Sequence, residues 1–213
     1  MNLFKISATL MILLFTTAIY SMQAPTNRLF LALEIPATNN NGEKIDFNNV
    51  EQFISNRVGG WKSEPKHLTI LFIGDIPQNA IETVKEAIKK AVNQFPPHSL
   101  NLSNVTVKGG VLLGNALGYE LNENASLSAL HSLLKAEIAA ALDKKGISHK
   151  LMSGFPFKPH ITLGRAGNVQ QASSLASQLG APVSMKNKPF TFKTLTLYSS
   201  QGGKYVPVMQ WQL

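Results

Sequence analysis

Apolar positions divide the first half of the chain into alternating strands and helices. RLFLALEIP and KHLTILFIGDI are β-rich apolar runs, and they predict strands over residues 29–35 and 66–76. Apolar residues at helical spacing follow each run. They predict a short amphipathic helix that ends at Gly59 and Gly60, and a longer helix over residues 77–95 that begins at Pro77.

The second half continues the alternation. LNLSNVTVKGG and VLLGNALGYELN predict two strands that meet in a hairpin turn near Gly109 and Gly110. Residues 125–146 have the strongest helical periodicity in the chain, with His131 on the helix surface rather than in a ligand site. A strand around His160, a helix over residues 169–179 and two final strands joined by QGGK complete the pattern. No glycine-rich phosphate loop follows any strand, which argues against a dinucleotide-binding fold and a P-loop.

The N-terminal segment differs from the rest of the chain. One lysine precedes an apolar stretch over residues 6–20, and small and polar residues follow it, which is typical of a secretory signal peptide. We therefore expect residues 1–24 to direct export to the periplasm or the medium, and residues 25–213 to form a single domain. An uncleaved membrane anchor and a buried N-terminal helix are the alternatives.

Composition and charge narrow the classes of function. Hydrophobic residues make up 44% and charged residues 15% of the chain, which is typical of a folded globular protein. The net charge of +8 favours polyanionic partners such as nucleic acids, nucleotides or acidic membrane surfaces. The chain has no cysteine, which excludes disulfides, thiolate nucleophiles and cysteine-bound zinc.

Two tetrads with the same chemistry occur 93 residues apart. His67-Leu68-Thr69-Ile70 matches His160-Ile161-Thr162-Leu163, and a proline and a lysine precede each of them. Residues two apart in a strand project from the same face, so each histidine shares a surface with the threonine of its own tetrad. A single such motif is most often structural, but two copies in the same aliphatic frame indicate a site.

Two such strands, related by a pseudo-twofold axis, would surround one cleft with two imidazoles and two hydroxyls. Hydroxyls and a protonated imidazole donate hydrogen bonds to phosphate oxygens, and a neutral imidazole accepts a proton. Cleavage of a phosphodiester needs this pair of an acid and a base. No group of acidic residues stands near either histidine at metal-ligand spacing, so we expect neither a metal ion nor a cofactor.

These motifs resemble those of the 2H phosphoesterase superfamily, and within it the RNA 2′,3′-cyclic phosphodiesterases, historically called 2′-5′ RNA ligases. RLFLALEIP, HLTILFIGDIP, FKPHITLGR and LYSSQGGKYVPV carry the resemblance through nearly the whole chain after the N-terminal segment. It implies an α+β, bilobal fold with two pseudo-symmetric antiparallel sheets, helices on the outside and a central cleft. It also implies hydrolysis of 2′,3′-cyclic phosphates on RNA ends or small nucleotides to 2′-phosphates, without a metal. Members of the family are generally cytoplasmic, which is the alternative location.

The resemblance also implies roles for individual residues. His67 would be the proton donor and His160 the proton acceptor, although a symmetric site does not by itself fix this assignment. Thr69 and Thr162 would hold phosphate oxygens. Arg165 either contacts the phosphate, if a twist or bulge near Gly164 turns it to the cleft, or forms an exterior salt bridge.

Other residues and functions stay open. Tyr198, Tyr205 and Lys204 lie in the last two strands, where a ring either stacks on a base or packs in the core or at the edge. Trp61 and Trp211 are expected in the core or the cleft wall. No stable protein partner is implied, and we expect a monomer. Formation or cleavage of 2′-5′ linkages and an exported nucleotide-binding protein without turnover are the alternative functions.

Overall fold

The structure is a computed structural model that describes residues 25–94, 102, 105–151, 156–180, 185, 188–201 and 204–213. The predicted signal peptide, residues 1–24, lies outside the described residues. None of the helices in the described ranges is long and apolar enough to cross a membrane.

The strands form one antiparallel sheet. In the described part of the chain the sheet has eight strands in the order β4-β5-β6-β3-β1-β7-β8, and β2 pairs with β6. Every pairing is antiparallel. The strand bounds are β1 Thr26–Glu34, β2 Lys62–Ser63, β3 His67–Pro77, β4 Val107–Leu113, β5 Ala116–Leu121, β6 His160–Arg165, β7 Thr194–Gln201 and β8 Lys204–Gln212.

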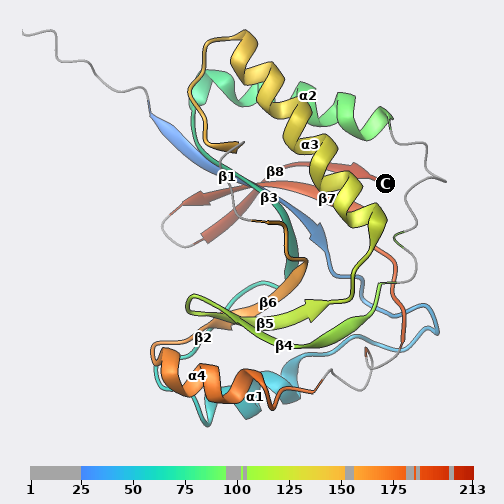
Figure 1. The fold of residues 1–213 in the computed structure, drawn as a ribbon, viewed down its shortest axis with the longest axis vertical. Helices are drawn as coiled ribbons and strands as arrows, with labels where there is room; N and C mark the ends of the chain where they lie inside the picture. The colour runs from blue at the N-terminus through green and yellow to red at the C-terminus, as the bar shows by residue number, and fades with distance from the viewer. Residues whose placement is uncertain are drawn as a thin grey trace, which may run out of the picture.

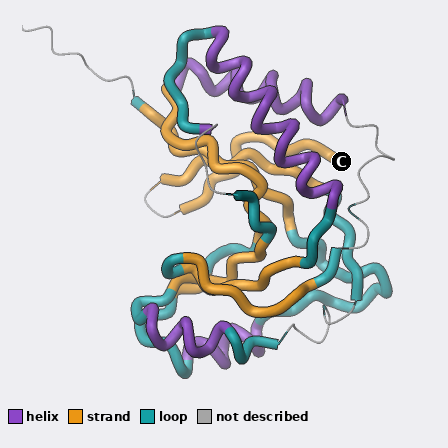
Figure 2. Tube along the Cα trace, in the orientation of Figure 1, coloured by secondary structure: helices purple, strands orange, loops and turns teal. Residues whose placement is uncertain are grey.

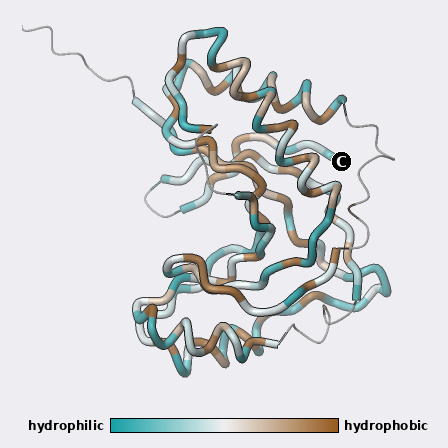
Figure 3. Tube along the Cα trace, in the orientation of Figure 1, coloured by the Kyte–Doolittle hydropathy of each residue, from teal (hydrophilic) through white to brown (hydrophobic). Residues whose placement is uncertain are grey.

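Helices cover the sheet in two pairs on the outside of the molecule (Figures 1 and 2). Helices α2 (Ile81–Gln94) and α3 (Ala125–Lys144) lie side by side near β3, β1, β7 and β8, whereas α1 (Asn48–Ser55) and α4 (Val169–Ala176) lie near β4, β5 and β6. Hydrophobic and hydrophilic positions alternate along α2 and α3 (Figure 3), as expected for helices that bury one face. The predicted helix over residues 125–146 is confirmed as α3, and its apolar stripe of Leu127, Leu130, Leu134 and Ile138 is fully buried.

The two halves of the sheet meet at one point. Strand β3 pairs with β6 only through Leu68 and Ile161, so β3-β1-β7-β8 and β4-β5-β6 form two lobes that join at this pair (Figure 1). The expected α+β architecture is confirmed. The two predicted sheets are continuous with each other through the two strands that carry the histidine motifs.

The predicted hairpin turn at Gly109 and Gly110 is wrong. Both glycines lie inside β4, and the turn falls at Gly114 and Asn115, where Gly114 has a φ of +62°. Gly110 is needed for packing rather than for a turn, because a Cβ there would collide with the backbone carbonyl of Ala176 and the side chain of Leu179. Two adjacent glycines are typical of a turn, but here Gly110 allows α4 to pack closely against β4.

Candidate active site

The two histidine motifs occupy adjacent strands at the junction of the lobes. Leu68 and Ile161 lie opposite each other in an antiparallel pair, so the flanking positions bring His67 opposite Thr162 and Thr69 opposite His160. Leu68 and Ile161 are fully buried, and the other four side chains project from the opposite face of the strands. Cross-strand neighbours stand about 5 Å apart, so two imidazoles and two hydroxyls share one small surface.

Both histidines have the same hydrogen bond to the backbone. Nδ1 of His67 lies 2.8 Å from the carbonyl oxygen of Pro65, and Nδ1 of His160 lies 2.7 Å from the carbonyl oxygen of Lys158. A carbonyl oxygen only accepts, so each Nδ1 carries the hydrogen. Nε2 is therefore the atom at which each ring gains and loses a proton.

Burial lowers the pKa of both histidines. Loss of solvent is the largest cause for His67 and for His160, and the backbone hydrogen bonds oppose it. Carboxylates also oppose it: Glu64 raises the pKa of His67, and Glu120 raises that of His160. The charge of His160 lowers the pKa of His67, as expected for two imidazoles that share a surface.

A β-bulge follows each motif and decides where the next side chains point. In β6, Gly118 of β5 pairs with Thr162 and Leu117 pairs with Gly164, which leaves Leu163 as the extra residue. Ala116, two residues from Gly118, pairs with Arg165. Arg165 therefore lies on the same face as Thr162, as the sequence allowed if a bulge occurred here.

The bulge in β3 repeats this arrangement. Ala32 of β1 pairs with Thr69 and Leu31 pairs with Leu71, which leaves Ile70 as the extra residue at the equivalent position. Phe72, the counterpart of Arg165, returns to the face of Thr69 and is 65% exposed. The repeat thus extends beyond the four matching residues, with an arginine at one rim and an aromatic ring at the other.

Comparison with known families decides the relationship. The sequence profile of the 2′-5′ RNA ligase superfamily matches residues 47–204, which include both histidine motifs. The chain belongs to this superfamily of 2H phosphoesterases. Membership supports an enzyme of the phosphodiesterase or ligase type.

Several solved structures have the same fold as this chain at low sequence identity. Escherichia coli LigT, complexed with NADP+, is 19% identical over 88% of this chain and 98% of that chain, with a TM-score of 0.51. TT0787 of Thermus thermophilus is 19% identical over 87% of this chain and 97% of that chain, with a TM-score of 0.56. A structure described as a phosphoesterase is 18% identical over 88% and 98%, with a TM-score of 0.51. No curated protein sequence matches significantly.

Aromatic rings surround the histidine of the first motif. The ring centroids of Phe30 and Tyr205 each lie 5.4 Å from that of His67, and Tyr205 stands edge-on to it. Tyr198 stacks on Phe30 at 5.2 Å and lies 6.3 Å from His67. The structure therefore places Tyr198 and Tyr205 beside the motif, whereas Trp211 is buried, as expected.

Glu64 links the arginine to the first motif. Its carboxylate accepts a 2.7 Å hydrogen bond from Nε of Arg165 and a 3.0 Å bond from the hydroxyl of Tyr205. Arg165 also donates to Asn115 at 3.1 Å. The guanidinium thus forms a salt bridge at the rim of the site, and its contact with phosphate stays a prediction.

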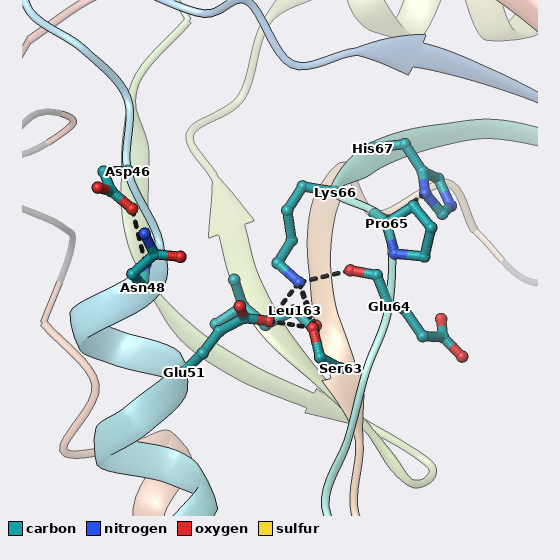
Figure 4. A network of polar contacts seen from close by, with 9 residues as sticks. All are labelled: Asp46, Asn48, Glu51, Ser63, Glu64, Pro65, Lys66, His67 and Leu163. Atoms are coloured by element: carbon teal, nitrogen blue, oxygen red, sulfur yellow. Dashed lines mark hydrogen bonds and ion pairs between the residues drawn. The ribbon is translucent and has the colours of Figure 1, made fainter.

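Lys66 connects the two motifs through its ammonium group (Figure 4). It donates to the carbonyl oxygen of Leu163, the bulge residue of the second motif, at 2.7 Å, and also to the carbonyl oxygen of Glu64. Glu51 of α1 forms the ion pair with it, and Ser63 lies 3.1 Å away. Sequence patterns assigned no functional role to Glu64 or Lys66, because their partners lie far away along the chain.

Among the described residues, no group of three or more His, Asp or Glu side chains is arranged to hold a metal ion. The side chains of the two motifs and of Arg165 offer proton transfer by the imidazoles and hydrogen-bond donation by hydroxyl, imidazole and guanidinium groups.

Proposed function

We propose that the protein is a phosphodiesterase that hydrolyses 2′,3′-cyclic phosphates, on RNA ends or on small nucleotides, to 2′-phosphates without a metal ion. The observation that carries this proposal is the matched pair of imidazoles. Each is held by an Nδ1 hydrogen bond to a carbonyl two residues earlier, and each shares its face with the threonines of both motifs.

The proposed reaction transfers one proton at each histidine. Nε2 of His160 takes a proton from water as the water oxygen attacks phosphorus. The bond between phosphorus and O3′ breaks, and the protonated Nε2 of His67 delivers its proton to O3′. The products are a 2′-phosphate and a free 3′-hydroxyl. Both rings are restored when His160 releases one proton to solvent and His67 takes one up.

Burial supports the role of the threonines in this reaction. Thr69 and Thr162 are 8% and 6% exposed, so their hydroxyls offer hydrogen bonds in a site largely shielded from water. Donors fixed in a site of low polarity stabilise developing negative charge more strongly than donors in water. The assignment of His67 as acid follows the resemblance, because each histidine has a carboxylate nearby that favours its charged form.

The experiment is hydrolysis of 2′,3′-cyclic AMP and of a cyclic-phosphate-ended oligonucleotide in EDTA, with products separated by chromatography. We expect 2′-phosphates, and near-complete loss of turnover for His67→Ala and His160→Ala but not for the control His149→Ala. Nucleotide binding without product would refute hydrolysis. A 2′-5′-linked product from added hydroxyl ends would favour the ligase alternative.

A p-nitrophenyl phosphodiester tests the division of roles between the histidines. Its leaving group needs no proton, so His67→Ala should lose far less activity on it than on the cyclic substrate, whereas His160→Ala should lose activity on both. The reverse pattern would exchange the acid and the base.

Export is a separate proposal that rests on residues 1–24 alone. Fusion of residues 1–30 to a reporter that is active only outside the cytoplasm tests it. An inactive reporter would favour the cytoplasmic alternative.

A further inference from the structure

A cavity of about 690 Å³ adjoins the face that carries the motifs. Thr69 and His160 line one end of it, and it continues along β3 as far as Gly74. Helix α3 and the chain that leads into β6 form its other walls. Six consecutive residues of β3 extend over about 16 Å, so the cavity is longer than one nucleoside.

Stacked rings form part of this wall. His131 of α3 and Phe157 lie parallel, with ring centroids 4.5 Å apart and an angle of 6° between the planes. Both line the cavity, and Phe157 stands three residues before His160. Flat aromatic and imidazole rings are the surfaces on which unpaired bases of single-stranded RNA stack. His131 lies on α3, as the sequence predicted, and its ring is part of the cavity wall.

The charged groups around the cavity are positive. Lys135 follows His131 by about one helical turn, and Lys150 and Lys158 stand on the chain that leads into β6. No aspartate or glutamate lines the cavity among the described residues, and no described carboxylate forms a salt bridge with Lys135 or Lys158. Ammonium groups beside stacked rings suit a phosphate next to a base.

We infer that this cavity binds the nucleotide that precedes the cyclic-phosphate end, so that the preferred substrate is an oligonucleotide of two or more residues. The base stacks on the pair of His131 and Phe157, and the linking phosphate lies near Lys135 and Lys158. A volume of about 690 Å³ is within the range of small-molecule sites, roughly 300–1,000 Å³. The inference rests on the proposed function for the position of the terminal phosphate.

The test compares adenosine 2′-phosphate with the dinucleotide ApA 2′-phosphate by calorimetry, and the two corresponding cyclic phosphates by kcat/KM. Stacking of one base contributes about 1–3 kcal/mol, so the dinucleotide should bind roughly 5- to 150-fold more tightly. His131→Ala and Lys135→Ala should each reduce this ratio without weakening the mononucleotide. Lys89→Ala, an exposed lysine of α2, should leave both affinities unchanged.

The outcomes separate the cavity from the chemistry. Equal affinity for the two ligands, or equal weakening of both by His131→Ala, would overturn the subsite even if both cyclic substrates are hydrolysed. A binding ratio that depends on His131 and Lys135, with no hydrolysis of either substrate, would support the subsite and refute the proposed function.

Discussion

Replacement of Lys66 by methionine removes the ammonium group that connects the two motifs. Methionine keeps an unbranched apolar stem, so the main loss is of the hydrogen bonds to Leu163 and Glu64 and the ion pair with Glu51. The Lys66 and Glu51 side chains are 15% and 22% exposed. The change therefore leaves a largely buried carboxylate without its counter-charge.

The structure gives the size of the effect on stability. Loss of one partner of a buried polar group costs about 1–3 kcal/mol. Glu51 still accepts a hydrogen bond from Ser63 and is partly solvated, so we expect about 2 kcal/mol in the free energy of unfolding, again from the range for a buried polar group. For a domain of this size the melting temperature should fall by about 4–8 °C.

The effect on catalysis should exceed the effect on substrate binding. Lys66 precedes His67 and holds the carbonyl of Leu163, so its loss alters the position of one motif relative to the other. A misplacement of about 1 Å costs up to 100-fold in rate, so we expect kcat on 2′,3′-cyclic AMP to fall about 10- to 100-fold with KM changed far less. Lys66→Arg should restore part of the rate.

Urea unfolding and steady-state kinetics measure the two effects on the same preparations. Lys62→Met is the matched control, because Lys62 is an exposed lysine on the neighbouring strand β2 and should affect neither quantity. A Lys66→Met protein that loses stability but keeps its kcat would refute the positioning role. A Lys66→Met protein as stable as the parent would refute the expected loss of about 2 kcal/mol in the free energy of unfolding.

Burial and packing lead to four further predictions. The pKa values of His67 and His160 lie below the ordinary 6.5, so kcat/KM should be greatest below pH 6.5. Because the unfolded chain then binds more protons, the free energy of unfolding should decrease as pH falls from 7 toward 5. Tyr119→Phe should raise the free energy of unfolding by about 1 kcal/mol, because the buried hydroxyl has no hydrogen-bond partner among the described residues. Gly164→Ala should destabilise the fold and lower kcat, because a Cβ there would collide with Trp61 and the carbonyl of Lys62, next to the bulge that orients Arg165.

Each of these predictions has an outcome that contradicts it. A kcat/KM optimum well above pH 6.5, or the same pH dependence of stability in a His67→Gln, His160→Gln double variant, would show that burial does not control these histidines. A less stable Tyr119→Phe protein would reveal a partner for the hydroxyl. A Gly164→Ala protein as stable in urea as the parent would show that β2 and β6 shift to accommodate the added methyl group.

Local patterns were sufficient for most of the elements and for the core of the site. The stripe of α3 was predictable because Leu127, Leu130, Leu134 and Ile138 recur at the helical period, which requires no knowledge of the rest of the chain. That His67 and His160 belong to matching motifs was predictable because the same tetrad occurs twice. In each case the signal lies within a few neighbouring residues or in a repeat of them.

The two motifs, their strands and the main helices were readable without a structure, because they depend on side-chain period and local chemistry. The tertiary structure decided the rest, because it depends on contacts between distant segments. The bulge at Leu163 put Arg165 on the face of Thr162, where a regular strand would put it on the other. Packing against α4 explains Gly110, and Lys66 meets a carbonyl group 97 residues away. The spacing of residues within one segment does not predict such contacts, because they form only when distant segments pack together.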